Sequence, residues 1–235
     1  MDIIGAINKE REYLSFRMKG EEPYSFQQEI RKYGFESIED YLKAKRDYEF
    51  SLLKFEVIET NAEKAISDVF KAIEQRRTSV LFAKTDKTLV WNGNSGNYNV
   101  EYCTECNIPI YPLNTGGGTI VSTPGDLNIG ICYPENEKFD STYILNKFVE
   151  VFKKYTDKPV IASGNDILVN EYKVLGSATY RASGMFVFVT PVSMSEKDQL
   201  VCNICLKHST KQPGYIDFIT ADRLREEVEI WLGAQ

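Results

Sequence analysis

The sequence predicts an α+β domain over residues 58–235, preceded by a helical N-terminal extension over residues 1–57. Two observations predict this fold class. Short apolar strands follow one another in hairpins, with turn residues between them and amphipathic helices set to one side, a grouping typical of α+β domains. Hydrophobic residues make up 43% of the chain and charged residues 26%, which is ordinary globular usage and argues against disorder over most of its length.

The first 57 residues are rich in charge, Tyr and Phe, and they are expected to be helical. Two capping boxes predict helix starts, one from Ser25 to Gln28 and one from Ser37 to Asp40. The apolar stripe after Ser37 fits two interpretations. The extension is either an appendage that packs its own aromatic face, or a docking surface for a partner.

From residue 61 onward the pattern alternates between helices and strands. Asn61 is expected to cap a helix whose apolar residues recur at helical spacing up to the Glu-Gln-Arg-Arg run at 74–77. The strands predicted next span residues 80–83, 88–91, 98–101, 108–111, 119–121 and 127–132. A helix over 143–155, capped by Asp140 or Ser141, comes before strands at 167–169, 172–175 and 185–192. Helices near 196–207 and 222–231 close the chain.

Two polar segments carry the signal for a functional site. The first, residues 112–131, contains three consecutive glycines, Gly116, Gly117 and Gly118, and then a Gly-Asp-Leu-Asn turn. Without Cβ atoms, such a backbone can take positive φ and turn its N–H groups toward an anion or a carbonyl. The alternative is a plain hairpin turn. The second segment, residues 164–178, joins an Asn-Asp pair, a tight turn and the run Lys-Val-Leu-Gly-Ser-Ala that begins at Lys173.

From about Asn61 to the C-terminus, the order and spacing of these segments resemble the lipoate-protein ligase A branch of the biotin ligase, lipoate ligase and octanoyltransferase superfamily. The resemblance implies a biotin/lipoate-ligase-like catalytic domain, with mixed and antiparallel sheets flanked by helices. Lys173 then corresponds to the lysine that contacts the acyl carboxylate and the activated acyl-phosphate. The other implied substrate- and nucleotide-binding residues are Gly116, Gly117, Gly118, Gly125, Asp126, Asn128, Asn165, Asp166, Gly176 and Ser177. Trp91 stands where the acyl pocket of this family begins.

The chain also departs from the family pattern. Pro112 and Leu113 stand where the family usually has two arginines before the glycine loop, and residues 187–192 lack the histidine that often follows the lysine motif. Losing two guanidinium groups removes the strongest partners of a triphosphate. Arg181 is the first choice as a replacement cation, with Lys158 or Lys211 as alternatives.

Three functions are consistent with these residues. The first is an ATP-dependent ligase that activates lipoate, octanoate or a similar acid as an acyl-adenylate, with the acyl chain in a dry tunnel lined by residues such as Trp91, Val121 and Ile129. The second is an ATP-independent acyltransferase with a cysteine nucleophile. The third is a non-catalytic member that binds a ligand or a partner. The resemblance further implies an acceptor lysine on a lipoyl domain or a protein like the glycine-cleavage H protein. It also implies a separate accessory subunit if the extra C-terminal domain of many such ligases is needed.

Metal sites are predicted at two places. Asp166 or Asp126 could hold Mg²⁺ together with ATP phosphates, since magnesium is usually held by one or two carboxylates plus substrate oxygens. Four of the five cysteines form two Cys-x-x-Cys pairs, Cys103 with Cys106 and Cys202 with Cys205, and His208 follows the second pair. The pairs could be two halves of a zinc site. The competing interpretation is that they are small buried hydrophobic residues of the core.

Composition narrows the partners and the compartment. The net charge of -6, with no long run of Lys or Arg, argues against a nucleic-acid or anionic-membrane partner. The sequence shows neither an apolar stretch long enough to span a membrane nor the pattern of a secretory signal peptide. An odd number of cysteines is unlike a secreted disulfide framework. A cytoplasmic protein is therefore expected.

Overall fold

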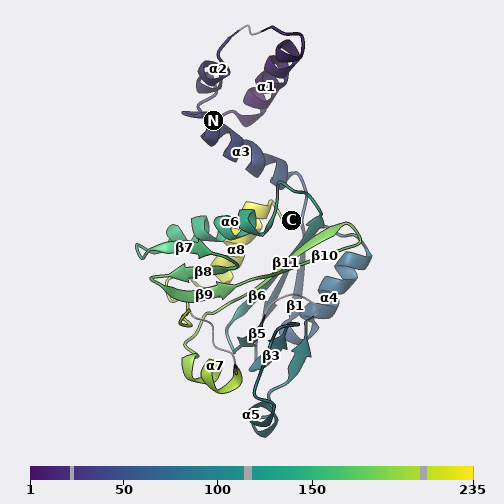
Figure 1. The fold of residues 1–235 in the computed structure, drawn as a ribbon, viewed down its shortest axis with the longest axis vertical. Coiled ribbons are helices and arrows are strands. Elements are labelled where there is room, and N and C mark those ends of the chain that lie inside the picture. Colours follow the sequence, from purple (N-terminus) through teal and green to yellow (C-terminus); the bar gives the residue numbers. More distant parts are fainter. Residues whose placement is uncertain (22–23, 114–117, 207–210, 235) are drawn as a thin grey trace. The chain divides into compact units, whose positions relative to one another are not determined.

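The computed structural model describes residues 1–21, 24–113, 118–206 and 211–234. These residues form two compact units, Met1–Leu53 and Lys54–Gln235, which Figure 1 colours along the chain. Each unit is described by itself. Within the described ranges, no helix is long and apolar enough to cross a membrane.

The N-terminal unit is helical, as its composition indicates. It contains α1 (Ile3–Met18), α2 (Phe26–Lys32) and α3 (Ile38–Ser51). The capping box at Ser37 is formed, since Asp40 N donates to Ser37 Oγ at 3.0 Å and Ser37 N donates to Asp40 Oδ2 at 3.1 Å. The capping box predicted at Ser25 is wrong, because Ser25 precedes α2 but its side chain makes no capping hydrogen bond. Ile30, Phe35 and Tyr41 lie at the centre of this unit's own apolar core.

The second unit is built on a large mixed sheet with the order β1-β2-β6-β11-β9-β8-β7, in which β10 also pairs with β11. Among the described strand pairings of this sheet, β1–β2 is parallel and the others are antiparallel. Its strands are β1 (Glu56–Asn61), β2 (Ser79–Lys84), β6 (Leu127–Pro134), β7 (Val160–Ser163), β8 (Asp166–Val169), β9 (Tyr172–Gly176), β10 (Ala178–Ala182) and β11 (Met185–Val192). Strands β9 and β10 follow each other along β11 with Ser177 between them, so the predicted lysine motif lies where one strand passes into the next.

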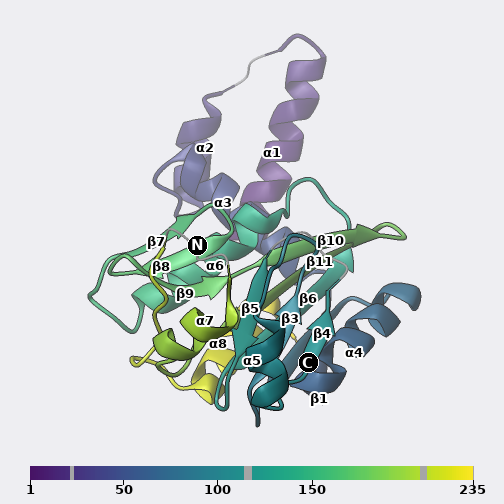
Figure 2. The same ribbon diagram turned by 60° about the horizontal axis from the view of Figure 1, so that its bottom comes forward.

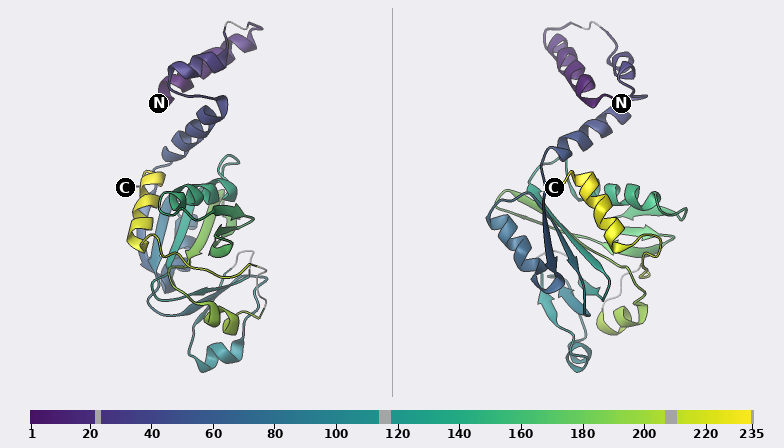
Figure 3. Two further views of the ribbon diagram at one scale, coloured as in Figure 1. Left: turned by 90° about the vertical axis from the view of Figure 1, so that its left-hand side faces the viewer. Right: turned by 180° about the vertical axis from the view of Figure 1, so that it is seen from behind.

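Helices cover both faces of the large sheet, rather than the single side expected from the sequence. Helix α4 (Ala62–Glu74) packs on Cys132, Met185 and Val187, whereas Phe188 points the other way and stacks on Phe148 of α6 (Ser141–Lys153). Neighbouring residues of a strand face opposite sides, so the two helices lie on opposite faces. Helix α8 (Ala221–Leu232) joins α6 through contact between Trp231 and Phe148. In the right-hand view of Figure 3, α4 and α8 lie on either side of β1.

A smaller sheet has the order β4-β3-β5, formed by β3 (Leu89–Asn92), β4 (Ile110–Pro112) and β5 (Thr119–Ser122). Trp91 faces a core that includes α4 residues. Its neighbour Val90 faces the opposite side, where the short helices α5 (Val100–Glu105) and α7 (Asp198–Ile204) pack. Figure 2 shows α5 and α7 near this sheet. The segment with the glycine loop lies between β4 and β5 in the chain.

One predicted strand is wrong. Residues 98–101 do not form a strand, because the Asn99 side chain accepts a hydrogen bond from Tyr102 N at 3.0 Å and starts helix α5. Strands β1, β7 and β10 were not expected from the sequence. The helix predicted near 196–207 is shorter and ends at Ile204, with Cys205 in extended conformation.

Candidate active site

The β8–β9 hairpin brings three of the predicted site residues together. Asn170 and Glu171 have φ values of 50° and 72°, the conformation of a two-residue type I′ turn, which fixes the register of the strands. Lys173 Nζ lies 2.8 Å from Asp166 Oδ1. A Cβ atom added at Gly176 would lie 2.7 Å from Lys173 Cε and 2.8 Å from its Nζ. A glycine at this position therefore leaves the space that the ammonium group occupies.

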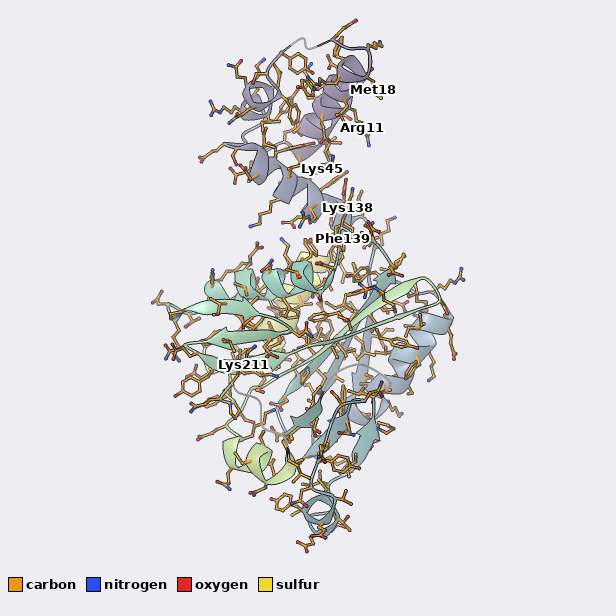
Figure 4. All side chains as sticks on the ribbon, viewed as in Figure 1. Arg11, Met18, Lys45, Lys138, Phe139 and Lys211 are labelled. Atoms are coloured by element: carbon orange, nitrogen blue, oxygen red, sulfur yellow. The ribbon has the colours of Figure 1, made fainter. Side chains whose placement is uncertain are left out.

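A second lysine reaches the same carboxylate from a distant part of the chain. Lys211 Nζ lies 2.7 Å from Asp166 Oδ2 and donates to the backbone carbonyl of Ser163 at 2.7 Å. Its segment is held in place because Lys173 N donates to Gln212 O at 2.8 Å. Figure 4 labels Lys211 beside strands β8 and β9.

This cluster of Lys173, Asp166 and Lys211 has two positive charges against one negative charge. The lysine side chains are 33% and 25% exposed and the carboxylate is 17% exposed, so a ligand can reach them. Ammonium groups that are partly shielded from water attract an anion more strongly than fully solvated ones. The cluster can therefore bind a carboxylate or a phosphate oxygen.

Asn165 and Ser177 are next to this cluster and hold its backbone. Ser177 donates to the Asn165 carbonyl twice, through N at 2.8 Å and through Oγ at 2.9 Å. Thr190 Oγ1 donates to the Gly176 carbonyl at 3.1 Å, which ties the same turn to β11. The Asn165 side chain is exposed. These contacts make the turn rigid and leave the Asn165 amide accessible to a ligand.

The glycine loop is described only at its edges. Gly116 and Gly117 lie outside the described residues, whereas Gly118 is described and exposed. Gly93 N donates to Gly118 O at 3.1 Å, and Leu113 N donates to Asn92 O at 2.8 Å. Both edges of the loop are thus fixed to the end of β3, directly after Trp91.

The turn before β6 contains a buried ion pair. Asp126 is fully buried, and its Oδ2 accepts from Lys197 Nζ at 2.5 Å and from Thr123 N at 2.8 Å. Its Oδ1 accepts from Met194 N at 2.9 Å. A buried carboxylate requires such partners. Asp126 therefore ties the segment that leads into α7 to the turn, and its oxygens are occupied by protein donors.

An apolar cavity of about 40 Å³ lies between α4 and the large sheet. Its wall contains two of the three residues expected to line an acyl tunnel, Trp91 and Ile129, whereas Val121 is not part of it. Asn128 also lines the cavity, and its Nδ2 donates to Thr85 Oγ1 at 2.7 Å. The full set of lining residues is Ala65, Ile66, Val69, Phe70, Ile73, Leu81, Trp91, Leu113, Asn128, Ile129, Gly130, Tyr180, Val187 and Val189.

The cavity and the lysine cluster are linked through β11. Val189 lines the cavity and pairs with Ala178, the second residue after Gly176. Pro191 pairs with Asn128, which also lines the cavity. The passage from β9 to β10 therefore runs beside the cavity wall, as a site that holds a chain and its charged head group requires.

Arg181 is not brought to this cluster. It lies near the β10–β11 turn, where its Nε is 2.7 Å from Glu135 Oε1 and its guanidinium lies 5.0 Å from the Phe186 ring centre. Lys158 pairs with Asp217 at 3.5 Å. Of the three cations considered as replacements for the missing arginines, Lys211 is therefore the one that joins Lys173.

The cysteine pairs are partly brought together. Cys103 and Cys205 are buried in one apolar cluster, where burial raises the pKa of both thiols, whereas Cys106 and Cys202 are exposed. His208 lies outside the described residues. Within the described ranges, no three or more His, Cys, Asp or Glu side chains gather where they could hold a metal ion. The burial of Cys103 and Cys205 thus supports the interpretation of these two residues as part of the core.

Two lysines that pair with aspartates here carry little signal in the sequence. The sequence indicates Lys211 only as an alternative cation, and it does not indicate Lys197. Neither belongs to a motif, and each meets its aspartate across 45 or 71 residues of sequence. Only the fold brings these pairs together.

Solved structures share this fold. A bi-partite lipoate protein ligase of Thermoplasma acidophilum is 15% identical with a TM-score of 0.62, over 78% of this chain and 85% of that chain. LipL1 of P. falciparum, in complex with lipoate, is 14% identical with a TM-score of 0.63, over 77% of this chain and 62% of that chain. A lipoate-protein ligase A bound with ATP is 15% identical with a TM-score of 0.61, over 77% of this chain and 87% of that chain. The TM-scores show a shared fold, that of the lipoate-protein ligases, as expected from the sequence.

Sequence comparison shows the family. No curated protein matches the chain. The family model described as the lipoyl protein ligase A/B catalytic domain matches residues 64–201, more than half of the 235 residues. The match includes the glycine loop, the hairpin with Lys173 and the cavity-lining strands. The chain therefore belongs to the lipoyl protein ligase A/B catalytic domain family, as a lipoate-protein ligase-like enzyme.

Proposed function

We propose that the chain is an ATP-dependent ligase, which activates lipoate, octanoate or a similar acid as an acyl-adenylate and transfers the acyl group to an acceptor lysine. The observation that carries this proposal is the placement of two ammonium groups, those of Lys173 and Lys211, on one carboxylate beside Gly176. A family relative of similar fold is bound with ATP and another is in complex with lipoate, which supports both substrates.

The chemistry needs positive charge where negative charge builds up. In the first step a carboxylate oxygen attacks the α-phosphorus of ATP, and the bond to pyrophosphate breaks. Lys173 is proposed to donate hydrogen bonds to the carboxylate and to an α-phosphate oxygen, because fixed donors aimed at developing charge stabilise the transition state. In the second step the neutral amine of the acceptor lysine attacks the acyl carbon, AMP leaves, and the amine releases a proton to solvent.

Asp166 is a positioning residue in this scheme. It holds one ammonium group at each of its two oxygens and offsets their mutual repulsion before substrate arrives. Lys173 has three donors, so it can keep Asp166 and still bind a substrate oxygen. Lys211 is proposed to supply the phosphate-binding charge that Pro112 and Leu113 do not.

The residues fit ATP better than they fit a protein-bound magnesium ion. The Asp166 oxygens each accept from an ammonium group, and Asp126 is buried with its own lysine. Nearby positive charge opposes a divalent cation, so neither carboxylate is assigned as a magnesium ligand. Mg²⁺ brought by ATP would be held by the phosphate oxygens and water, as is common for this ion.

The acceptor is proposed to be a lysine of a lipoyl domain or of a protein like the glycine-cleavage H protein. The Thermoplasma ligase of similar fold is described together with its E2 lipoyl domain and as bi-partite. That description supports a lipoyl-domain acceptor here, and it supports a separate accessory subunit as a further partner.

Thermal melting with different ligands tests the proposal. Saturating ATP, Mg²⁺ and lipoate or octanoate are expected to raise the melting temperature by mass action, with about 2.7 kcal/mol of stabilisation at a hundredfold excess over Kd. If an acyl thioester shifts the melt while ATP and a non-hydrolysable acyl-adenylate analogue do not, the ligase proposal fails and an ATP-independent transferase replaces it.

A further inference from the structure

Trp91 has a polar group that no other described residue satisfies. Its side chain is only 4% exposed, and its Nε1 has no hydrogen-bond partner among the described residues. A buried donor without an acceptor is costly, because it has lost its hydrogen bond to water. Such groups are rare in folded proteins and point to a partner supplied from elsewhere.

The described neighbours of Trp91 do not supply that partner. Trp91 lies on β3 in a cluster of aliphatic and aromatic side chains, among them Ala65, Leu81 and Leu113. In the cavity wall, the side-chain acceptor of Asn128 is Oδ1, which accepts from Ser122 Oγ at 3.4 Å and not from the indole. Among the described residues of the wall, the indole therefore adds a donor without an acceptor beside mainly aliphatic and aromatic side chains.

The position of this donor indicates which part of a ligand it would meet. The proposed function places the ligand's carboxylate at Lys173 on β9, so the cavity along α4 receives the chain. The cavity has room for about three water molecules, which is too small for an eight-carbon chain. Binding of such a chain therefore requires the side chains of α4 to move away from the sheet. A plain alkyl chain offers the indole N–H no acceptor. A chain that carries a sulfur or an oxygen atom does.

We propose that Trp91 is a specificity-determining residue, whose indole N–H selects acids with a neutral hydrogen-bond acceptor in the chain over unsubstituted fatty acids. The inference rests on the proposed function, because it uses the cavity as the acyl site. It narrows the substrate class to acids such as lipoate, whose ring sulfurs are weak acceptors, or a keto acid of equal length.

The discrimination can be measured with three acids and two matched variants. Trp91→Phe keeps an aromatic ring and removes the donor. Trp231→Phe makes the same chemical change on α8, at the opposite face of the sheet, where Trp231 packs on Phe148. Binding of lipoate, octanoate and 7-oxooctanoate is measured by calorimetry. One net hydrogen bond corresponds to about a three- to tenfold change in affinity.

The expected result is that Trp91→Phe lowers the affinity for lipoate or 7-oxooctanoate relative to octanoate about three- to tenfold, while Trp231→Phe leaves both ratios unchanged. The acid that shows the larger change identifies sulfur or oxygen as the preferred acceptor. The chain has two tryptophans, so its indole N–H resonances can be assigned with Trp231→Phe. The Trp91 resonance is expected to move downfield with the favoured acid and not with octanoate.

Two contrary outcomes are separable. If the acids bind but Trp91→Phe changes neither ratio and the Trp91 resonance does not move, the inference is overturned and the proposed function stands. If none of the three acids binds, with or without ATP and Mg²⁺, the proposed function fails and the inference fails with it.

Discussion

Gly176→Ala tests the geometry of the lysine cluster without removing any charge. The added methyl carbon would lie 2.7 Å from Lys173 Cε, 2.8 Å from Lys173 Nζ and 3.3 Å from Asp166 Oδ1. Favourable carbon contacts are about 3.5–4.0 Å, so the ammonium group must retreat by roughly 1 Å. A misplacement of about 1 Å can cost on the order of a hundredfold in rate. We expect a loss of that size in acid-dependent exchange of pyrophosphate into ATP.

The fold should tolerate this change. The atoms that the new methyl group meets are the flexible end of a side chain, and Gly176 is not among the glycines with positive φ. Weakening a partly exposed ion pair costs about 0–1 kcal/mol, and replacing glycine by alanine at a compatible position gains about 0.4–1 kcal/mol. The melting temperature should therefore change by only a few degrees.

A double-mutant cycle with Lys173→Ala separates the proposed cause from others. If the methyl group acts by displacing the ammonium group, Gly176→Ala should have no further effect once Lys173 is alanine. Lys84→Ala, which removes an exposed lysine paired with Asp222, serves as the charge control and should keep wild-type exchange. Wild-type exchange in Gly176→Ala, or losses that add in the double variant, would refute the geometric argument.

Three further predictions follow from the same contacts. Lys211→Ala should remove most of the melting-temperature shift produced by ATP, whereas Arg181→Ala should keep it because that guanidinium pairs with Glu135; the reverse result would make Arg181 the phosphate-binding cation. A thiol reagent near pH 7.5 should modify Cys106 and Cys202 quickly in native protein, with or without a chelator. The reason is that the other thiols are buried, and burial raises the pKa of Cys132 to about 11. If Cys106 and Cys202 react slowly until a chelator is added, the result would instead indicate zinc binding. Phe148→Ala should lower the free energy of unfolding by about 3–5 kcal/mol in denaturant titrations, since Phe148 is fully buried against Phe188, and a loss below 1 kcal/mol would contradict that packing.

Local signals in the sequence predicted local structure well. The helix capped at Asn61 and the Ser37 capping box are both confirmed. They could be predicted because the cap and the apolar spacing lie within a few residues of each other. A strand was wrongly predicted at 98–101 because Tyr98 and Val100 are residue types that favour strands. In the structure the Asn99 side chain caps the start of a helix instead. Strand β10 has no apolar run of its own and forms because β11 offers a pairing edge.

The site residues likewise divide into those that a local motif predicts and those that only the fold brings together. Lys173, Asp166 and Gly176 lie within one hairpin, so a short motif could predict that they act together. The contact of Lys211 with Asp166 depends on how a segment 45 residues away runs beside β9, which no local pattern records. The unpaired donor of Trp91 likewise appears only when its neighbours are known. Sequence patterns thus locate the reacting hairpin, and the three-dimensional fold supplies its second cation.

The most direct test of the account is to detect the product of the first step. Purified protein is incubated with ATP, Mg²⁺ and lipoate, octanoate or 7-oxooctanoate, and the mixture is analysed by mass spectrometry for acyl-adenylate and pyrophosphate. The account predicts an acyl-adenylate with wild-type protein and with Lys84→Ala, and none with Lys173→Ala at an unchanged melting temperature. Absence of adenylate from wild-type protein, or its full formation by Lys173→Ala, would contradict the claim that this lysine cluster activates a carboxylic acid.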